Sequence, residues 1–185
     1  MNNPVLLLLV VVVLVVVAGG LWFASRRRKS AEIREQFGPE YDRTVREYGA
    51  TGPAERALIE RTERVQQLHV RALSEERSSQ YAAEWHTVQS RFVDDPQAAI
   101  GEADHLVTEV MQARGYPMGD FEQRAADVSV DHPHVVENYR AAHAIANRTR
   151  TGEAATEDLR QAMVHYRALF AELIDARQPA TSEAR

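Results

Sequence analysis

The chain has 185 residues, enough for one domain with appendages, and its charge is divided unevenly along its length. All 27 Asp and Glu lie after residue 29, together with 18 of the 22 Lys and Arg. Because proteins bind nucleic acid by neutralising its phosphates with Lys and Arg, this acidic main part excludes nucleic acid as an expected partner. The chain has no Cys, which excludes disulfides, thiol catalysis and Cys-ligated zinc.

An uncharged apolar run occupies residues 5–24, after a short tail at residues 1–4. A helix of that length measures about 30 Å, which is the thickness of the hydrocarbon core of a bilayer. A cleaved export signal would carry positive charge ahead of a shorter apolar run, and nothing before Pro4 is basic. We therefore expect an uncleaved transmembrane helix over residues 5–24, with the lipid bilayer as its partner.

Charged and aromatic residues at the end of this run predict its orientation. Trp22 has the position of an interfacial aromatic residue, and a basic juxtamembrane stop follows at residues 25–30, formed by Arg26, Arg27, Arg28 and Lys29. Since Lys and Arg are retained on the cytoplasmic side, we expect a single-pass protein of the cell membrane with a cytoplasmic C-terminal domain. The alternative is an exported domain that faces the outside, because a basic segment upstream of the given start would reverse the orientation.

Helical periodicity dominates the residues after the anchor. Residues 31–53 predict a helix broken by Gly38-Pro39 and followed by a linker, because proline removes a backbone donor. A charged helix is predicted over residues 54–72. Its apolar seam is interrupted by Arg61, so we interpret it as a solvated helix with one docked face.

The clearest amphipathic pattern begins after Ser74, which can cap a helix. Four residues share one face of that helix and predict a central seam of the core: Tyr81, Trp85, Val88 and Phe92. Asp95 and Pro96 predict the start of the next helix, and Gly115 predicts its end.

The region from residue 116 to residue 132 is the least regular. Asp120 predicts the cap of a short helix there, and residues 128–130 read as extended. Pro133 is expected to open a further helix, and Thr156 is expected to cap the last one.

The fold class that these patterns predict is all-α, since no stretch alternates convincingly with a period of two. We expect a single N-terminal transmembrane helix followed by a soluble helical bundle of about five to six helices over residues 54–177. Residues 178–185 form a polar tail without a period, and we expect it to be disordered.

Two runs in the second half of the chain carry a resemblance: RFVDDPQAAIGEADHLVTEVMQARGYPMGDFEQRAADVSVDHPHVVENYR and TEDLRQAMVHYRALF. Over residues 91–174 the chain resembles an uncharacterised bacterial family of helical proteins with an N-terminal apolar segment, often labelled only as secreted or membrane proteins. The resemblance implies a helical fold and no particular activity. The label "secreted" conflicts with the orientation that the flanking charges predict.

Candidate site residues gather in one region without forming a recognisable motif. The densest set of possible metal ligands or general bases is Asp131, His132, His134 and Glu137, and a helix start accounts for them equally well. His143 is a further candidate ligand. His143 lies on an apolar face, which is typical of a hydrogen-bonded core histidine, with Asp127, Asp131 or Tyr139 as partners. We therefore assign no catalytic residue, no cofactor and no metal.

A second possible metal motif lies on the helix that follows Pro96. Glu102 and His105 have the Glu-x-x-His spacing of di-iron bundles, but the second such motif is missing. The helical period also turns both side chains toward water.

Two functions remain open. We prefer a non-enzymatic interaction or scaffolding module at the cytoplasmic membrane face, whose partner is a membrane-associated protein or a second copy in a homo-oligomer. The alternative is a small membrane-tethered hydrolase or metal-dependent enzyme that uses residues 127–143. The first function requires no feature that the sequence lacks, whereas the second requires side chains to converge in space.

Overall fold

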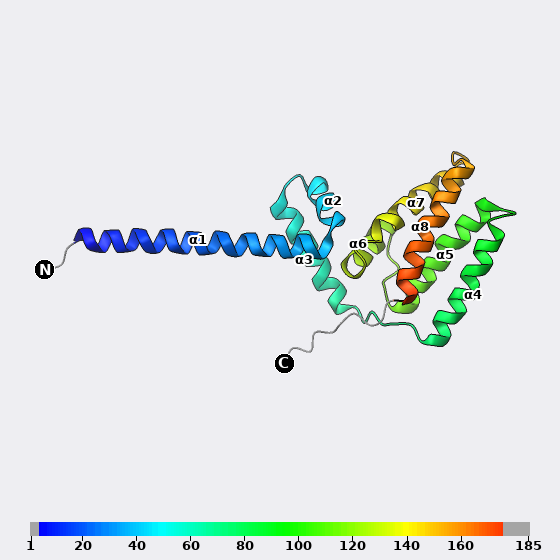
Figure 1. The fold of residues 1–185 in the computed structure, drawn as a ribbon, viewed down its shortest axis with the longest axis horizontal. Helices are drawn as coiled ribbons and strands as arrows, with labels where there is room; N and C mark the ends of the chain where they lie inside the picture. Colours follow the sequence, from blue (N-terminus) through cyan, green and yellow to red (C-terminus); the bar gives the residue numbers. More distant parts are fainter. Residues whose placement is uncertain (1–3, 176–185) are drawn as a thin grey trace. The chain divides into compact units, whose positions relative to one another are not determined.

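The computed structural model describes residues 4–175, and within them the chain forms eight α-helices and no strand (Figure 1). The predicted all-α class is therefore confirmed. Two compact units are present, Met1–Gln36 and Phe37–Arg185. Residues 1–3 of the predicted N-terminal tail and the predicted polar tail at residues 178–185 lie outside the described residues.

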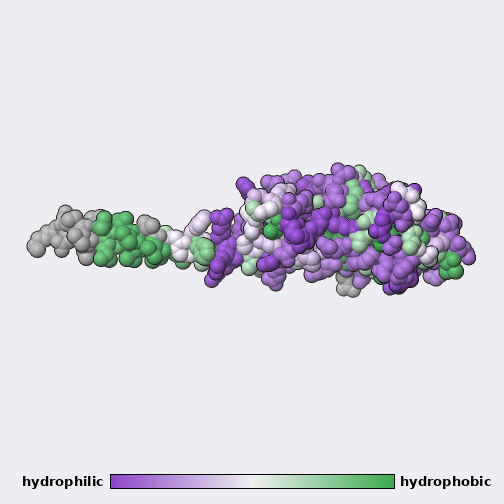
Figure 2. Space-filling view, turned by 90° about the horizontal axis from the view of Figure 1, so that it is seen from above, coloured by the Kyte–Doolittle hydropathy of each residue, from purple (hydrophilic) through white to green (hydrophobic). Residues whose placement is uncertain are grey.

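The first unit consists of most of helix α1 (Pro4–Phe37), which runs without a break through the four cations. The described large apolar side chains of residues 8–24 are exposed, among them Leu14, Leu21 and Trp22. Figure 2 shows hydrophobic residues gathered along this part of the helix. In the described part of the chain, no helix is both long enough and apolar enough to cross a membrane.

Helices α2 (Pro39–Tyr48) and α3 (Thr51–Gln67) form a hairpin at the start of the second unit. The predicted break at Gly38-Pro39 is confirmed, since Gly38 has φ +49° and Pro39 opens α2. The predicted linker up to residue 53 is wrong because Pro53 lies in the first turn of α3, where its missing N–H costs no helical bond.

The end of α3 also differs from the prediction. The helix stops at Gln67 rather than near residue 72, and Leu68 is already extended. The chain then crosses the end of another helix, where the Arg71 N–H donates to the Arg114 carbonyl at 2.9 Å. Local sequence periodicity cannot predict this backbone hydrogen bond, because it joins segments that are far apart in the chain.

Helices α4 (Glu75–Arg91) and α5 (Pro96–Arg114) begin where the sequence predicts, and α5 also ends where it predicts. Ser74 Oγ accepts from the Arg77 N–H at 3.3 Å, and an oxygen of Asp95 accepts from the Ala98 N–H at 3.0 Å. Gly115 ends α5 with φ +99°, and a Cβ there would lie 2.9 Å from the His69 carbonyl oxygen. Both the backbone conformation and the close approach require glycine.

Helices α6 (Phe121–Asp131), α7 (Val136–Arg150) and α8 (Thr156–Asp175) complete the unit. The extended segment predicted at residues 128–130 is wrong, because these residues continue α6. Val128 and Ser129 are fully buried there, so tertiary packing overrides the weak strand preference of valine. Thr156 is the first helical residue and not the cap, and Asp158 accepts from the Ala155 N–H at 3.0 Å.

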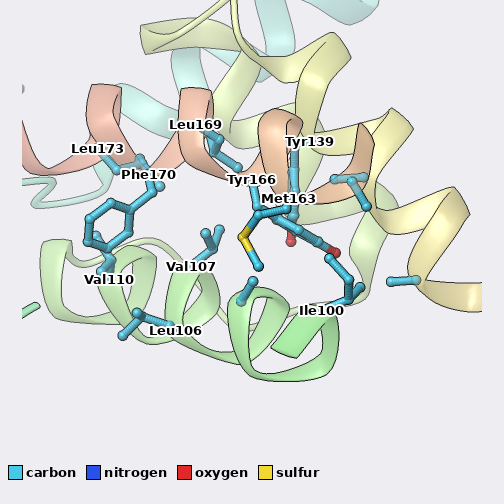
Figure 3. Close-up of a cluster of buried hydrophobic side chains, with 14 of the residues drawn as sticks. Ile100, Leu106, Val107, Val110, Tyr139, Met163, Tyr166, Leu169, Phe170 and Leu173 are labelled. Carbon is cyan, nitrogen blue, oxygen red and sulfur yellow. The ribbon is translucent and has the colours of Figure 1, made fainter. Parts of the chain in front are cut away.

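The core lies where α8 packs against α4, α5 and α7 (Figure 3). Tyr81, Trp85 and Val88 of α4 are buried in it, and Phe92 packs partly buried at its edge. The indole of Trp85 stacks on Phe170 of α8 with ring centroids 4.7 Å apart. The amphipathic face predicted for α4 is therefore part of the core. The α2–α3 hairpin packs against α6 and α7 instead.

Candidate functional site

The candidate ligands predicted from the sequence do not converge on one point; they are Asp131, His132, His134, Glu137 and His143. Asp131 accepts from the Tyr116 hydroxyl at 2.7 Å, while His134 is exposed. His132 and His143 face different partners, described below. Among residues 4–175, no group of three or more His, Asp or Glu side chains is arranged to hold a metal ion.

His132 is not a solvated residue at a helix start, because it is 6% exposed beneath the guanidinium of Arg114. Arg114 Nη1 lies 3.0 Å from His132 Nε2 and also donates to the Leu173 carbonyl at 3.3 Å. Glu172 Oε1 lies 3.3 Å from His132 Nδ1. Since arginine only donates, Nε2 is the acceptor and the imidazole is neutral with its proton on Nδ1.

Burial and the charge of Arg114 lower the pKa of His132 below its ordinary value, although Glu172 acts in the opposite direction. The ring of His132 is buried, and its two nitrogens face Arg114 and Glu172. Its role is to satisfy the buried cation Arg114, which is 1% exposed.

His143 pairs with Asp104 of α5 rather than with Asp127, Asp131 or Tyr139. Its Nδ1 lies 3.5 Å from Asp104 Oδ1, which also accepts from the Tyr166 hydroxyl at 2.8 Å. Burial acts to raise the pKa of Asp104, but the hydrogen bonds of His143 and Tyr166 outweigh it and lower that pKa.

The ring of His143 is also occupied. It stacks on Phe121 with centroids 3.7 Å apart, so the imidazole is fixed on both its edge and its face. These contacts tie α5, α6, α7 and α8 together.

Two further buried carboxylates join the α2–α3 hairpin to the bundle. Glu40 is fully buried and accepts at 3.0 Å from both Arg61 and Arg140. Asp127 is equally buried and accepts from Arg64 at 2.8 and 3.0 Å. The arginine that interrupts the predicted seam of α3 is thus an ion-pair partner. Glu40 and Asp127 are thus engaged in packing the helices together.

A solvent-accessible groove lies elsewhere, between α4 and α5, which pack side by side (Figure 1). Its volume is about 540 Å³. Val88 and Leu106, both nearly buried, form its floor. Its rim carries the carboxylates of Glu84, Glu102 and Glu109. The groove therefore combines an apolar base with an acidic border.

Gly101 deepens this groove. It lies inside α5, and a Cβ built at this position would meet nothing within 4 Å. Glycine inside a helix is about 1 kcal/mol less favourable than alanine, so neither the helix nor its packing explains this residue. An open space in front of the backbone is the feature that glycine provides here.

A second hollow of about 460 Å³ continues the groove toward the turn between α4 and α5. Thr87 and Ala98 line both hollows, and the second adds Asp94 and Asp95. Arg91 lies in this second hollow and forms an ion pair with Glu102.

Sequence reasoning placed Glu102 and His105 on the solvent side of their helix, and His105 is exposed while Glu102 is half-buried. It did not find the groove, because the groove exists only once α4 and α5 are paired. The signal that could have indicated it is the glycine within α5.

No protein-family model, no curated protein and no solved structure matches this chain. The family resemblance over residues 91–174 accordingly stays a prediction.

Proposed function

We propose that this chain is a single-pass membrane protein whose helical unit is a non-enzymatic interaction module at the cytoplasmic face. The observation that carries the interaction role is the α4–α5 groove, an accessible apolar surface with an acidic border. Apolar grooves rimmed by polar residues are the usual surfaces of protein recognition.

The membrane part of the proposal is supported by the sequence of α1. Residues 5–24 carry no charge, and four cations follow within the next five residues. A helix that is apolar on every side requires an apolar environment all around it. The described large apolar side chains of residues 8–24 are exposed in the isolated chain, so a bilayer would supply that environment.

An enzyme that uses residues 127–143 has less support. General acid–base or metal chemistry requires two or more groups within reach of one reacting atom. Asp131, His132 and His143 instead contact Tyr116, Arg114 and Asp104, respectively.

The anchor is tested by alkaline extraction of membranes from cells that express the full chain. We expect the protein to stay in the pellet, and we expect Leu9→Arg combined with Val12→Arg to release it. An arginine at the centre of a membrane helix costs about 2.5–3.5 kcal/mol on insertion scales. Release of the unchanged chain would contradict the anchor.

The orientation is tested separately with a C-terminal tag and protease added to intact spheroplasts. We expect the tag to survive until detergent opens the membrane. Replacing Arg26, Arg27, Arg28 and Lys29 with Glu should expose part of the population, because the retained cations set the orientation. Digestion of the unchanged protein from outside would contradict a cytoplasmic domain.

A further inference from the structure

We propose that the α4–α5 groove binds a cationic amphipathic helix from a membrane-associated protein. The apolar face of that helix would cover Val88 and Leu106, and its Lys and Arg would meet the rim carboxylates. This inference rests on the proposed interaction function and specifies the partner that the groove recognises.

The shape of the groove supports a helical occupant. Two packed helices present a groove between them into which the apolar ridge of a third helix fits. The two hollows share Thr87 and Ala98, so one continuous surface follows the α4–α5 pair toward its turn.

The charge of the rim selects a cationic occupant. Among the described residues that line the main hollow, three are Glu and none is Lys or Arg. Glu102 forms an ion pair with Arg91, and Glu109 Oε1 lies 3.3 Å from His105 Nε2. Glu84 has no ion-pair partner within residues 4–175. An acidic rim repels anionic lipid headgroups and attracts Lys and Arg side chains.

Gly101 sets how closely the occupant approaches. Without a side chain at this position, an apolar residue of the partner can reach the backbone of α5 beside Leu106. Apart from the backbone of α5 and the two adjacent residues, Ile100 and Glu102, no described atom lies within 4 Å of the point that a Cβ would occupy. The rest of the described chain therefore leaves this space open.

The test uses the full chain in neutral detergent and a dye-labelled synthetic peptide of about 18 residues, long enough for a stable helix. The peptide carries Leu on one helical face and Lys on the other, and a matched peptide carries Glu in place of Lys. We expect saturable binding of the Lys peptide by fluorescence anisotropy and at least about tenfold weaker binding of the Glu peptide. A carbodiimide cross-link, mapped by mass spectrometry, should join peptide lysines to Glu84, Glu102 or Glu109.

Three variants localise the binding. Gly101→Leu should weaken it by at least about tenfold by filling the groove, and Glu84→Lys with Glu109→Lys should do so by reversing the rim charge. Gly101→Ala adds only a methyl group and favours the helix, so it should raise the melting temperature while still weakening binding. This variant separates loss of the groove from loss of the fold.

Matched controls lie on α7, away from the groove. Ala144→Leu adds the same kind of side chain at a helical position outside the groove, and Glu137→Lys reverses an exposed charge. Both should leave the dissociation constant within about twofold, as surface changes usually do. Binding of the peptide to the detergent is the same for every variant, so comparing the groove variants with these controls cancels its contribution.

Three outcomes would overturn the proposal: equal binding of all groove variants, cross-links that map outside the groove, or a dimer of the chain itself that excludes the peptide. Failure of the anchor is read in a different experiment, the alkaline extraction. A chain that is extracted yet binds the peptide in the groove keeps this inference. A chain that stays in the membrane and binds nothing loses only this inference.

Discussion

Arg114 is the largest of the fully buried side chains, and its guanidinium is held by one histidine and two carbonyl groups. Such a cation tolerates a neutral imidazole as acceptor but not an imidazolium. The charges that face His132 are Arg114 from α5, Asp131 from α6 and Glu172 from α8. The balance among them favours the neutral ring in the folded state.

This balance predicts a dependence of stability on pH. Because the folded pKa of His132 lies below the unfolded value of about 6.5, the unfolded chain binds the proton first as pH falls. The contribution of His132 to stability should therefore be full above pH ~6.5 and decrease below it, by at most about 1.4 kcal/mol per pH unit, until the folded pKa is reached.

Denaturant unfolding at several pH values measures this slope. His132→Gln keeps a side chain that can accept from Arg114 but removes the titration, so its slope below pH ~6.5 should be flatter. His86→Gln, at an exposed position on α4, should keep the slope of the unchanged chain. Parallel slopes for the chain and His132→Gln would show that this histidine does not couple to folding.

Trp85 is a second residue whose role is measurable. It is 6% exposed and stacks on Phe170, so Trp85→Ala should lower the free energy of unfolding by about 3–5 kcal/mol. Trp22→Ala changes an exposed indole and should leave the unfolding of the helical unit unchanged. Chemical denaturation followed by circular dichroism gives both values, and a loss near zero for Trp85→Ala would refute its place in the core.

At the scale of elements, the α2–α3 hairpin depends on a buried ion triad. Glu40 accepts from Arg61 of its own hairpin and from Arg140 of α7, and the carboxylate is fully buried. Buried ion pairs add little stability compared with apolar packing of the same volume. Removing one charged group, however, leaves its partners buried without an opposite charge. The triad therefore positions the hairpin more than it stabilises it.

Glu40→Ala should accordingly destabilise the second unit by about 3–5 kcal/mol, because two arginines would be left without their shared acceptor. Replacing Glu40, Arg61 and Arg140 together by Leu or Met should restore most of that loss. Glu47→Ala, which removes an exposed partner of Arg43, should change stability by less than about 1 kcal/mol. Denaturant unfolding compares the three, and equal effects of Glu40→Ala and Glu47→Ala would contradict this description.

Local signals predicted the boundaries of elements well where a single turn decides them. Ser74 and Asp95 act through backbone groups within a few residues, so the local sequence contains the whole interaction. The same holds for the left-handed turn at Gly115, although its close approach to His69 is a distant contact. Residues 128–130 and the end of α3 were predicted wrongly because distant packing decides both. The surroundings of the candidate site residues could not be predicted for the same reason, since the partners of His132 and His143 come from α5 and α8.

At the scale of the whole chain, the sequence separates two kinds of surface. The first 29 residues hold the apolar run and the four cations that follow it, and every acidic residue of the chain lies after residue 29. This division could be predicted because composition alone carries it. The groove could not, because it requires Val88 and Leu106 to meet from two helices with Gly101 left open between them.

The pairing of Glu40 with Arg140 also sets an order of events during synthesis. The two residues lie 100 positions apart, and a ribosome adds about 5–20 residues per second. The hairpin is complete at Gln67, so about 70 further residues and about 4–14 seconds pass before Arg140 is added. Until then the Glu40 carboxylate has Arg61 and, at 3.8 Å, Arg43 as partners. The side of α3 that packs on α6 is uncovered until α6 is added, shortly before Arg140. The nascent hairpin is open to chaperones and to misassembly during this interval, and the arrival of Arg140 completes its contacts.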